Sequence, residues 1–342
     1  MFAKDNLRQK WDHAIECARG VAHAFMGTMR LLSPFGASLK KKIALGVSGL
    51  IVAFVVFNLI IMNATGWVPT KAPIPKKHEQ PGATLVLTVA DMLDEAAKNW
   101  QVNDLYWPTV MNDNYHDFQR GQLRMFRVVL YDLVKHLSCE RNPCTEDENL
   151  RAANSAINNN EDKWMLPAFE DKLHEAATAL RRYVKAKGYF NARGDNLKYL
   201  LENMSVALDG AQHELREEVL IAVGANKFAD TGSLARDAHQ AKHDGFRASS
   251  EVFYKTKGAL YVAIPVLRAL RMVECAELFE GKRAMPIVDN IILGFDVALS
   301  IQPVWVTNGY RVTPNIAALT VSLMSQSTRN LHSLYNTVLP NG

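Results

Sequence analysis

IALGVSGLIVAFVVFNLIIM, residues 43–62, is the stretch that decides the architecture of this chain. Its twenty residues carry no charge, and only Ser48 and Asn58 interrupt its apolar character. At about 1.5 Å of rise per residue, a helix of this length spans roughly 30 Å, the hydrocarbon thickness of a bilayer. A core helix of a soluble protein rarely stays apolar on every face for so long. The stretch therefore predicts one transmembrane helix, placed at 43–65.

The flanking residues predict the orientation of this helix. Lys40, Lys41 and Lys42 precede it directly, and Trp67 follows it, where an indole favours the lipid headgroup region. Basic residues stay on the cytoplasmic side of a bacterial inner membrane, so the large C-terminal part is expected in the periplasm. A cleaved signal peptide fits poorly, because the apolar run is long and begins far into the chain.

Residues 1–42 form a basic cytoplasmic arm. The arm carries eight basic and three acidic residues, a net charge of +5, which leaves −1 for the rest of the chain. Its apolar residues recur at roughly helical spacing, so it either lies as an amphipathic helix on the anionic inner leaflet or docks on a partner. The main domain has no concentrated basic excess, which argues against nucleic-acid binding.

Beyond the span, residues 66–82 are expected to form a proline-rich tether, because TKAPIPKKHEQPG at 70–82 has three prolines and little apolar content. The remainder, 83–342, is expected to be a periplasmic α-helical domain. Apolar residues at helical spacing predict helices over 84–100, 122–137, 167–188, 196–223, 249–278, 289–300 and 315–339. Pro265 is expected to kink the fifth of them. The fold class is therefore mainly α, a helical bundle or array.

Three polar stretches between these helices are expected to be loops. Residues 103–121, 138–162 and 226–245 lose the apolar period; the second includes the asparagine-rich NSAINNNED, with room for a short helix before it. The segment QPVWVTNGYRVTP, 302–314, places Asn308-Gly309 between β-forming residues. It predicts at most one small β-hairpin.

Four segments in this order resemble an uncharacterised bacterial membrane-protein family known as domain of unknown function 2333. They are VMNDNYHDFQRGQL at 110–123, YFNARGDNLKYLL at 189–201, SSEVFYKTKGALYVAIPVLRAL at 249–270 and PVWVTNGYRVTPNIAALTVSLM at 303–324. The resemblance implies a helical envelope domain behind an N-terminal span, and it implies no established activity. The chain departs from the family pattern in its longer basic arm, in Thr256-Lys257 before Gly258, and in an added cysteine pair.

The added cysteines are Cys139 and Cys144, which enclose ERNP on the expected oxidising side of the membrane. A loop of this length can close a disulfide, which is the favoured interpretation; a redox or metal-binding pair is the alternative. His239 and His243 have the i, i+4 spacing of metal ligands on a helix, but no third ligand accompanies them. No metal, cofactor-binding or catalytic residue is therefore assigned, and no cofactor is expected.

One polar cluster lies inside the segments that carry the resemblance. It consists of Asn112, Asp113, Asp117, Arg193, Asp195 and Asn196. Paired acids beside an arginine can perform general acid and base chemistry. The same residue types at helix ends more often cap helices and form buried hydrogen bonds. No nucleophile elbow, phosphate-binding loop, zinc-protease motif or dinucleotide fingerprint is present.

The leading functional hypothesis is a non-enzymatic, membrane-anchored periplasmic scaffold or accessory subunit of an envelope assembly. Its expected partners are the inner membrane, other envelope proteins and, as one option, further copies of itself. The alternative is a cell-wall-directed hydrolase or ligand-binding protein that uses the Asp113/Asp117 and Arg193/Asp195 regions. That alternative requires the two regions to converge on one open cleft.

Overall fold

The computed structural model describes residues 68–104, 112–138, 146–186, 194–223, 234–274, 276–281, 283–303 and 316–338, together with scattered positions between 46 and 57. Over these residues the chain is helical or irregular and contains no strand, so the mainly α prediction is confirmed for them. The expected hairpin at 302–314 lies almost wholly outside the described residues. The chain divides into two compact units, Met1–Trp67 with Leu105–Asn112, and Val68–Asp104 with Asp113–Gly342.

Only helical positions between 46 and 57, and Asn112, are described in the first unit. Leu50, Phe54 and Phe57 are well exposed there. Within the parts of the chain that are described, no helix combines the length and the apolar character needed to cross a membrane. Most of the predicted span at 43–65 falls outside those parts.

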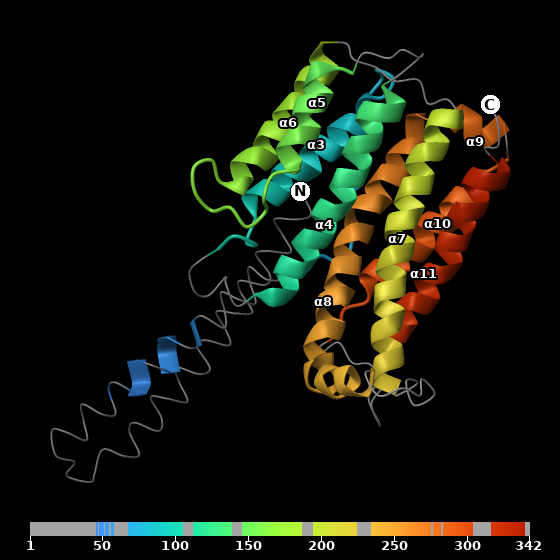
Figure 1. Ribbon diagram of the computed structural model, residues 1–342. Helices are drawn as coiled ribbons and strands as arrows, with labels where there is room; N and C mark the ends of the chain where they lie inside the picture. Colours follow the sequence, from blue (N-terminus) through green and yellow to red (C-terminus); the bar gives the residue numbers. More distant parts are fainter. Residues whose placement is uncertain are drawn as a thin grey trace, which may run out of the picture. The chain divides into compact units, whose positions relative to one another are not determined.

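The second unit is an array of helices (Figure 1). Their bounds are α3 Ala83–Lys98, α4 Asp113–Asp132, η2 Leu133–Leu137, α5 Glu148–Ile157, α6 Phe169–Lys185, α7 Gly194–Val223, α8 Leu234–Ala269, η4 Leu270–Glu274, α9 Ala276–Gly281, α10 Met285–Ser300, α11 Ile316–Ser333 and η5 Leu334–Val338. The segments η2, η4 and η5 are five-residue π-helical turns that follow α4, α8 and α11.

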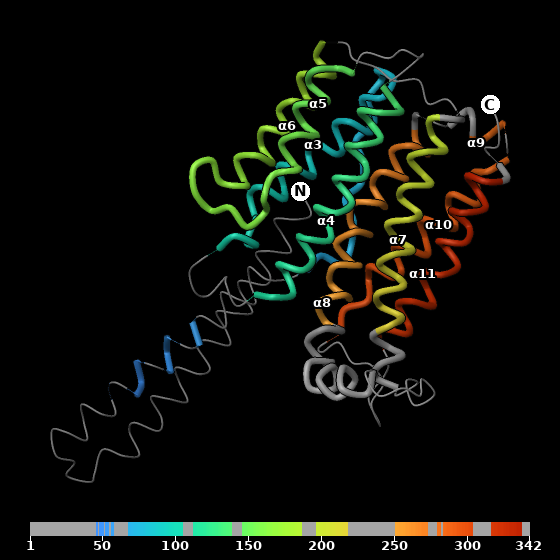
Figure 2. The backbone as a smooth tube through the Cα atoms, viewed as in Figure 1, coloured from blue at the N-terminus to red at the C-terminus, as the bar shows by residue number. Residues whose placement is uncertain are grey.

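Helices α4 and α8 lie side by side at the centre of this unit (Figure 1). The helices α3, α5 and α6 pack together on one side of the pair, and α7, α10 and α11 pack together on the other. The tube in Figure 2 shows that α7 runs opposite to α4. One continuous core of apolar side chains joins the layers, and Phe118, Phe126 and Phe253 are fully buried in it.

The central pair approaches closely because glycines replace side chains where α4 meets α8. A Cβ atom at Gly121 would overlap the backbone carbonyl of Lys255, and one at Gly258 would overlap the carbonyl of Phe118. Only glycine allows backbones to come this near. The crossing fixes the register of the two helices and therefore the position of every side chain around it.

The proline-rich segment was predicted to be an extended tether, but its described part, 68–82, belongs to the second unit and packs on its helices. Residues 68–82 contain no helix or strand, and yet Val68 and Ala72 belong to the hydrophobic core. The carbonyls of Ala72 and Pro73 each accept a hydrogen bond of 3.2 Å from Arg268 Nη1. An extended chain can pack in this way because side-chain donors satisfy its carbonyls in place of a regular ladder.

Two expected loops are helical in part. Helix α4 begins at Asp113 instead of Gln122, and α8 begins at Leu234, so a helix start at Ser249 was wrong. The buried face of α4 carries polar and small residues, Gln119 and Gly121 among them. Because these residues are not apolar, the spacing of apolar residues does not reveal this part of the helix. The short helix allowed for in the asparagine-rich stretch exists as α5, and it extends into that stretch as far as Ile157.

The bounds of several other helices agree with the ranges predicted from the spacing of apolar residues. Helix α3 starts at Ala83, after Gly82 in a left-handed conformation with φ of 79°, and α6 covers most of the expected 167–188. Helix α8 contains Pro265 in its interior, and the expected kink there stays a prediction. The helices α10 and α11 also fall at the two C-terminal positions expected.

Candidate functional site

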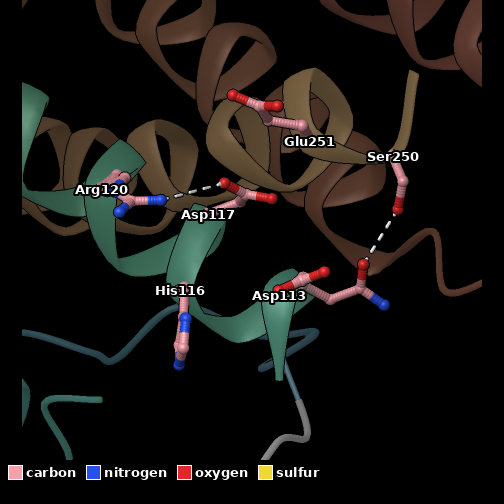
Figure 3. A pocket seen from close by; sticks show the side chains of 7 residues that line it. Asp113, His116, Asp117, Arg120, Ser250 and Glu251 are labelled. Carbon is pink, nitrogen blue, oxygen red and sulfur yellow. Dashed lines mark hydrogen bonds and ion pairs between the residues drawn. The ribbon is translucent and has the colours of Figure 1, made fainter. Parts of the chain in front are cut away.

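A polar pocket of about 450 Å³ opens where the start of α4 meets α8 (Figure 3). Two of the predicted site residues, Asp113 and Asp117, line it together. The other lining residues are Asn114, His116, Arg120, Ser250 and Glu251. The glycine crossing described above lies directly beyond these residues along both helices, so it holds the two walls of the pocket in register.

Helical spacing gathers the α4 residues at the pocket. Asp113, His116, Asp117 and Arg120 are three or four positions apart, which places them on one side of a helix. Asp113 lies in the first turn, where a negative charge interacts favourably with the helix dipole. This wall of the pocket is therefore a property of the local sequence once α4 starts at Asp113.

Asp117 is the most buried carboxylate of the pocket, with 7 % of its surface exposed. Arg120 Nη1 lies 3.8 Å from Asp117 Oδ1, and Arg120 Nη2 lies 3.3 Å from Asp162 Oδ1, so one guanidinium bridges two acids. The pKa of Asp117 is raised to about 6, mainly by burial and then by the Glu251 carboxylate, against the lowering effect of Lys255 and Arg120. Asp117 is therefore a carboxyl group that exchanges its proton near neutral pH.

The α8 wall contacts α4 through polar groups. Ser250 Oγ donates a hydrogen bond of 2.9 Å to Asn114 Oδ1, seen as a dashed line in Figure 3. Glu251 forms an ion pair with Lys255 one turn along α8. The Ser250–Asn114 hydrogen bond ties the two helices together at the rim, which is the structural role that polar residues at helix ends commonly have.

The remaining predicted site residues are not among the described residues that line this pocket. Asn112 is buried, and it belongs to the first compact unit. Arg193 and the side chain of Asp195 lie outside the described residues, and Asn196 is half-buried in the first turn of α7.

The start of α7 lies beside the opposite end of α4. The Tyr199 ring stacks on His136 with 4.3 Å between centroids, and Asn203 Nδ2 donates to Asp132 Oδ1 at 2.8 Å. The nineteen residue steps from Asp117 to His136 correspond to about 28 Å along a helix. The described part of α7 thus does not bring its N-terminal residues to the Asp113/Asp117 pocket, and the single cleft required by the hydrolase alternative is not formed there.

Cys139 and Cys144 lie outside the described residues, so the disulfide stays a prediction. The backbone of His239 and His243 is helical, within α8, but their side chains are not described. Where side chains are described, no three His, Cys, Asp or Glu residues gather closely enough to hold a metal ion.

A second polar cluster, which the sequence did not predict, surrounds Asp132 where α4 widens into η2. Asp132 is fully buried, and besides Asn203 its Oδ1 faces His136 Nε2 at 3.7 Å. Its Oδ2 atom is buried without a hydrogen-bond partner among the described residues. Burial raises the pKa of Asp132 to about 7, against the lowering effect of the Asn203 hydrogen bond. Widened helical turns of this kind often occur at functional sites.

Lys257 is a third buried polar group without a signal in the sequence. Its side chain is fully buried in α8, and Nζ donates a 2.6 Å hydrogen bond to the carbonyl of Ile301, the residue that ends α10. The Phe253 ring centroid lies 5.7 Å from Nζ. Burial lowers the pKa of Lys257 to about 8. A cation at the C-terminal end of a helix is favourable for the helix dipole, which gives this lysine a role in joining α8 to α10.

The predicted site lacked five of the pocket residues, namely Asn114, His116, Arg120, Ser250 and Glu251. The signal for Arg120 was its i+3 spacing from Asp117, which becomes visible only when 113–121 is treated as a helix. Ser250 and Glu251 lie in a segment that carries the family resemblance, but their pairing with α4 depends on a tertiary contact more than one hundred residues away.

Comparison with curated proteins and with solved structures returns no match for this chain. A family model does match, over residues 76–331. This range includes the helices from α3 to α10 and most of α11. The matched range also contains the pocket between α4 and α8 and the glycine crossing. The chain therefore belongs to the family DUF2333, described as an uncharacterized protein conserved in bacteria.

Proposed function

We propose that this protein is a membrane-anchored scaffold or accessory subunit of an assembly in the bacterial envelope, with its helical array in the periplasm. The observation that carries the proposal is the uncharged stretch 43–62, which directly follows three lysines and precedes the folded array. Its described positions are helical, and Phe54 and Phe57 expose about 60 % of their surfaces. Large apolar side chains exposed on a helix need an apolar environment, and a bilayer supplies it.

The polar pocket is compatible with a structural role. Arg120 bridges Asp117 and Asp162, Ser250 donates to Asn114, and Glu251 pairs with Lys255. Each of these interactions joins residues of the protein to one another. In an accessory subunit the Ser250–Asn114 bond serves to hold α4 on α8, and the Arg120–Asp162 pair holds the loop after α5 on α4, so that the surface of the array keeps one shape.

Membrane anchoring and topology are tested together by fusions at the C-terminus. We expect an alkaline phosphatase fusion to be active in intact cells, a green fluorescent protein fusion exported in unfolded form to be dark, and the unfused chain to resist alkaline carbonate extraction. Fluorescence inside the cell would overturn the periplasmic placement. Release by carbonate would overturn the anchor.

The scaffold role is tested by measuring the mass of the species that contains the protein after crosslinking in its native membrane. After crosslinking in cells and solubilisation in mild detergent, we expect a discrete species larger than the monomer. A variant in which residues 43–62 are replaced by an unrelated apolar span serves as the matched control, because it keeps the anchor and the array. A free monomer of the natural chain under these conditions would contradict the scaffold role while leaving the anchor intact.

A further inference from the structure

The polar cluster around Asp132 borders a pocket between α5 and α7. The volume of this α5–α7 pocket is about 490 Å³, within the range of pockets that hold small molecules. Helix α4 packs on both α5 and α7, which lie on opposite sides of it in Figure 1. Amide and apolar side chains make up most of the lining, among them Asn154 of α5, Asn203 and Val206 of α7, and Tyr131 of α4.

The two arginines of the pocket are already paired within the protein. Arg124 Nη1 lies 3.1 Å from Glu214 Oε1, and Arg127 Nη2 lies 2.8 Å from Glu161 Oε2. An anionic ligand would have to compete with these acids, and a cationic ligand would meet two guanidinium groups of its own sign. The charges of the pocket therefore favour a neutral ligand.

The asparagines offer a donor on one helix and an acceptor on the other. Asn203 Nδ2 donates to Asp132 Oδ1 at 2.8 Å, and Asn154 Oδ1 accepts from Asn158 Nδ2 at 3.2 Å. Half of each amide is thus engaged, and within the described residues no hydrogen bond uses Asn203 Oδ1 or Asn154 Nδ2. A ligand between α5 and α7 can therefore donate to Asn203 and accept from Asn154.

Asp132 adds a buried acceptor. It lines the pocket although its side chain is fully buried, and its Oδ2 atom has no hydrogen-bond partner among the described residues. Native proteins rarely leave such an atom unsatisfied. Because Oδ2 is covered, only a small donor such as a hydroxyl group, reaching it as the side chains around it adjust, would satisfy it.

Tyr131 and Val206 give the same pocket an apolar surface. They expose 48 % and 61 % of their surfaces. The Tyr131 ring meets the His136 ring edge-on, with 6.4 Å between centroids. The face of an aromatic ring is the negative end of its quadrupole, so it attracts weakly positive C–H groups. The pocket thus combines hydrogen-bonding groups with a surface for C–H groups.

We propose that the α5–α7 pocket binds a small neutral saccharide that carries acetamido groups. A sugar presents hydroxyl groups and a face of C–H groups on one ring, and an acetamido group supplies both a donor and an acceptor to asparagine amides. In this complex Asn154 and Asn203 bind the ligand from opposite helices, Tyr131 lies against a sugar ring, and Asp132 accepts from a hydroxyl group. The proposal does not depend on the membrane anchor.

The test is a titration of the full-length chain, in mild detergent, with N,N′-diacetylchitobiose, a neutral disaccharide with an acetamido group on each ring. Ligand-observed NMR measures the affinity and shows which sugar protons lie nearest the protein. We expect binding, with an acetamido methyl group and one ring face in contact. Asn154→Ala and Asn203→Ala should each weaken binding about fivefold, because each removes one hydrogen-bonding amide.

Asn159→Ala is the matched control. Asn159 follows α5 and is exposed, and its amide nitrogen donates to Ser155 O at 3.0 Å and to Ala156 O at 2.9 Å. It is not among the described residues that line the pocket, so the affinity of this variant should equal that of the natural chain. Tyr131→Ala changes an exposed side chain and should also weaken binding, so it decides the site even where Asn203→Ala does not fold.

Asp132→Asn isolates the contact with the hydroxyl group. The variant keeps an oxygen acceptor for Asn203 but replaces the second oxygen with an amide nitrogen, which donates. Binding should weaken about fivefold, since a hydroxyl donor loses its acceptor. Circular dichroism on the same sample shows whether the helices are intact, and an intact variant that binds as tightly as the natural chain would refute the role given to Asp132.

The remaining outcomes decide the class of ligand. No binding at millimolar disaccharide, or unchanged binding in both Asn154→Ala and Tyr131→Ala, would overturn the proposal. Chitobiose without its acetyl groups is cationic, and equally tight binding of this form would overturn the preference for a neutral acetamido sugar. Binding of the neutral dipeptide N-acetyl-alanyl-alanine amide in place of the disaccharide would assign the pocket to a peptide and overturn the saccharide.

Discussion

Gly121 of α4 and Gly258 of α8 each lie against the backbone of the other helix, at the carbonyls of Lys255 and Phe118 respectively. This reciprocal contact sets how closely the central pair of the array can approach. The polar pocket, the Asn114–Ser250 hydrogen bond and the buried Phe118 ring all lie within a few residues of it. The stability of the array and the geometry of the pocket therefore depend on the same crossing.

Gly121→Ala and Gly258→Ala should each destabilise the protein. The added methyl group overlaps backbone and not a flexible side chain, so the helices must separate, and overpacking of this kind costs about 1–3 kcal/mol. Gly210→Ala is the control, because its Cβ would meet only the end of the Arg124 side chain, at 3.0 Å, and alanine favours helix. Thermal unfolding followed by circular dichroism should show lower midpoints for the first two variants alone. A midpoint for Gly258→Ala at or above that of the natural chain would contradict the close crossing.

The apolar period predicted most of the helices but not where the central pair begins. Leu123, Phe126 and Leu130 identify the second half of α4, whereas its first half buries Gln119 and Gly121. Gln119 is satisfied by tertiary hydrogen bonds, accepting from Gln101 N at 2.8 Å and donating to Asn99 O at 2.7 Å. A pattern based on hydrophobicity cannot find such a face, because its stability depends on partners elsewhere in the chain.

The candidate site could be predicted only in part, because its geometry also depends on partners elsewhere in the chain. Asp113 and Asp117 were selected as a pair, and they do share a pocket. Their expected association with the 193–196 region fails for the described residues because α7 runs antiparallel to α4, and helix direction is not encoded in the local sequence. The packing of Val68 and Ala72 on the core was missed because prolines around them resemble a free linker.

Asp132 should make stability fall as pH rises toward 8. Its pKa is raised from 3.8 to about 7 by burial, so the stabilising effect of its protonated form is complete below about pH 4 and is lost as pH rises through about 7. Asp132→Asn keeps an acceptor for Asn203 and removes the titration. Between pH 5 and pH 8 the unfolding midpoint of the variant should therefore rise relative to that of the natural chain.

Asp209→Asn is the matched control for this pH series, because Asp209 is exposed on α7. It should retain the pH slope of the natural chain. A slope in Asp132→Asn equal to that of the natural chain would mean that the carboxyl group of Asp132 does not titrate in this window.

Lys257 should make stability rise with pH in the alkaline range, the opposite of the effect expected for Asp132. Its pKa is lowered from 10.5 to about 8 by burial, so the stability it contributes is complete above 10.5 and is lost as pH falls through about 8. Lys257→Met fills a similar volume without a charge but leaves the Ile301 carbonyl without its 2.6 Å hydrogen bond. Between pH 7 and pH 10 the midpoint of the natural chain should rise relative to that of Lys257→Met.

Lys255→Met is the control for that comparison, since Lys255 lies two residues away and pairs with Glu251 at the surface. Its midpoint should follow that of the natural chain over the same range. Parallel curves for Lys257→Met and the natural chain would show that Lys257 is not a buried titrating group.

Asn103 should hold the loop between α5 and α6, residues 158–168, in place. Its amide nitrogen donates to Lys163 O at 2.9 Å and to Glu170 Oε2 at 2.8 Å, so Asn103→Ala removes two contacts at the base of the loop. Trypsin cleaves after lysine only when the backbone can open locally, and we expect cleavage after Lys163 to become several-fold faster in this variant. Asn99→Ala is the matched control, because the Asn99 amide nitrogen donates to Glu95 O, one turn earlier in the chain, at 3.0 Å. Cleavage after Lys163 at the same rate in both variants would show that the loop is not held by Asn103.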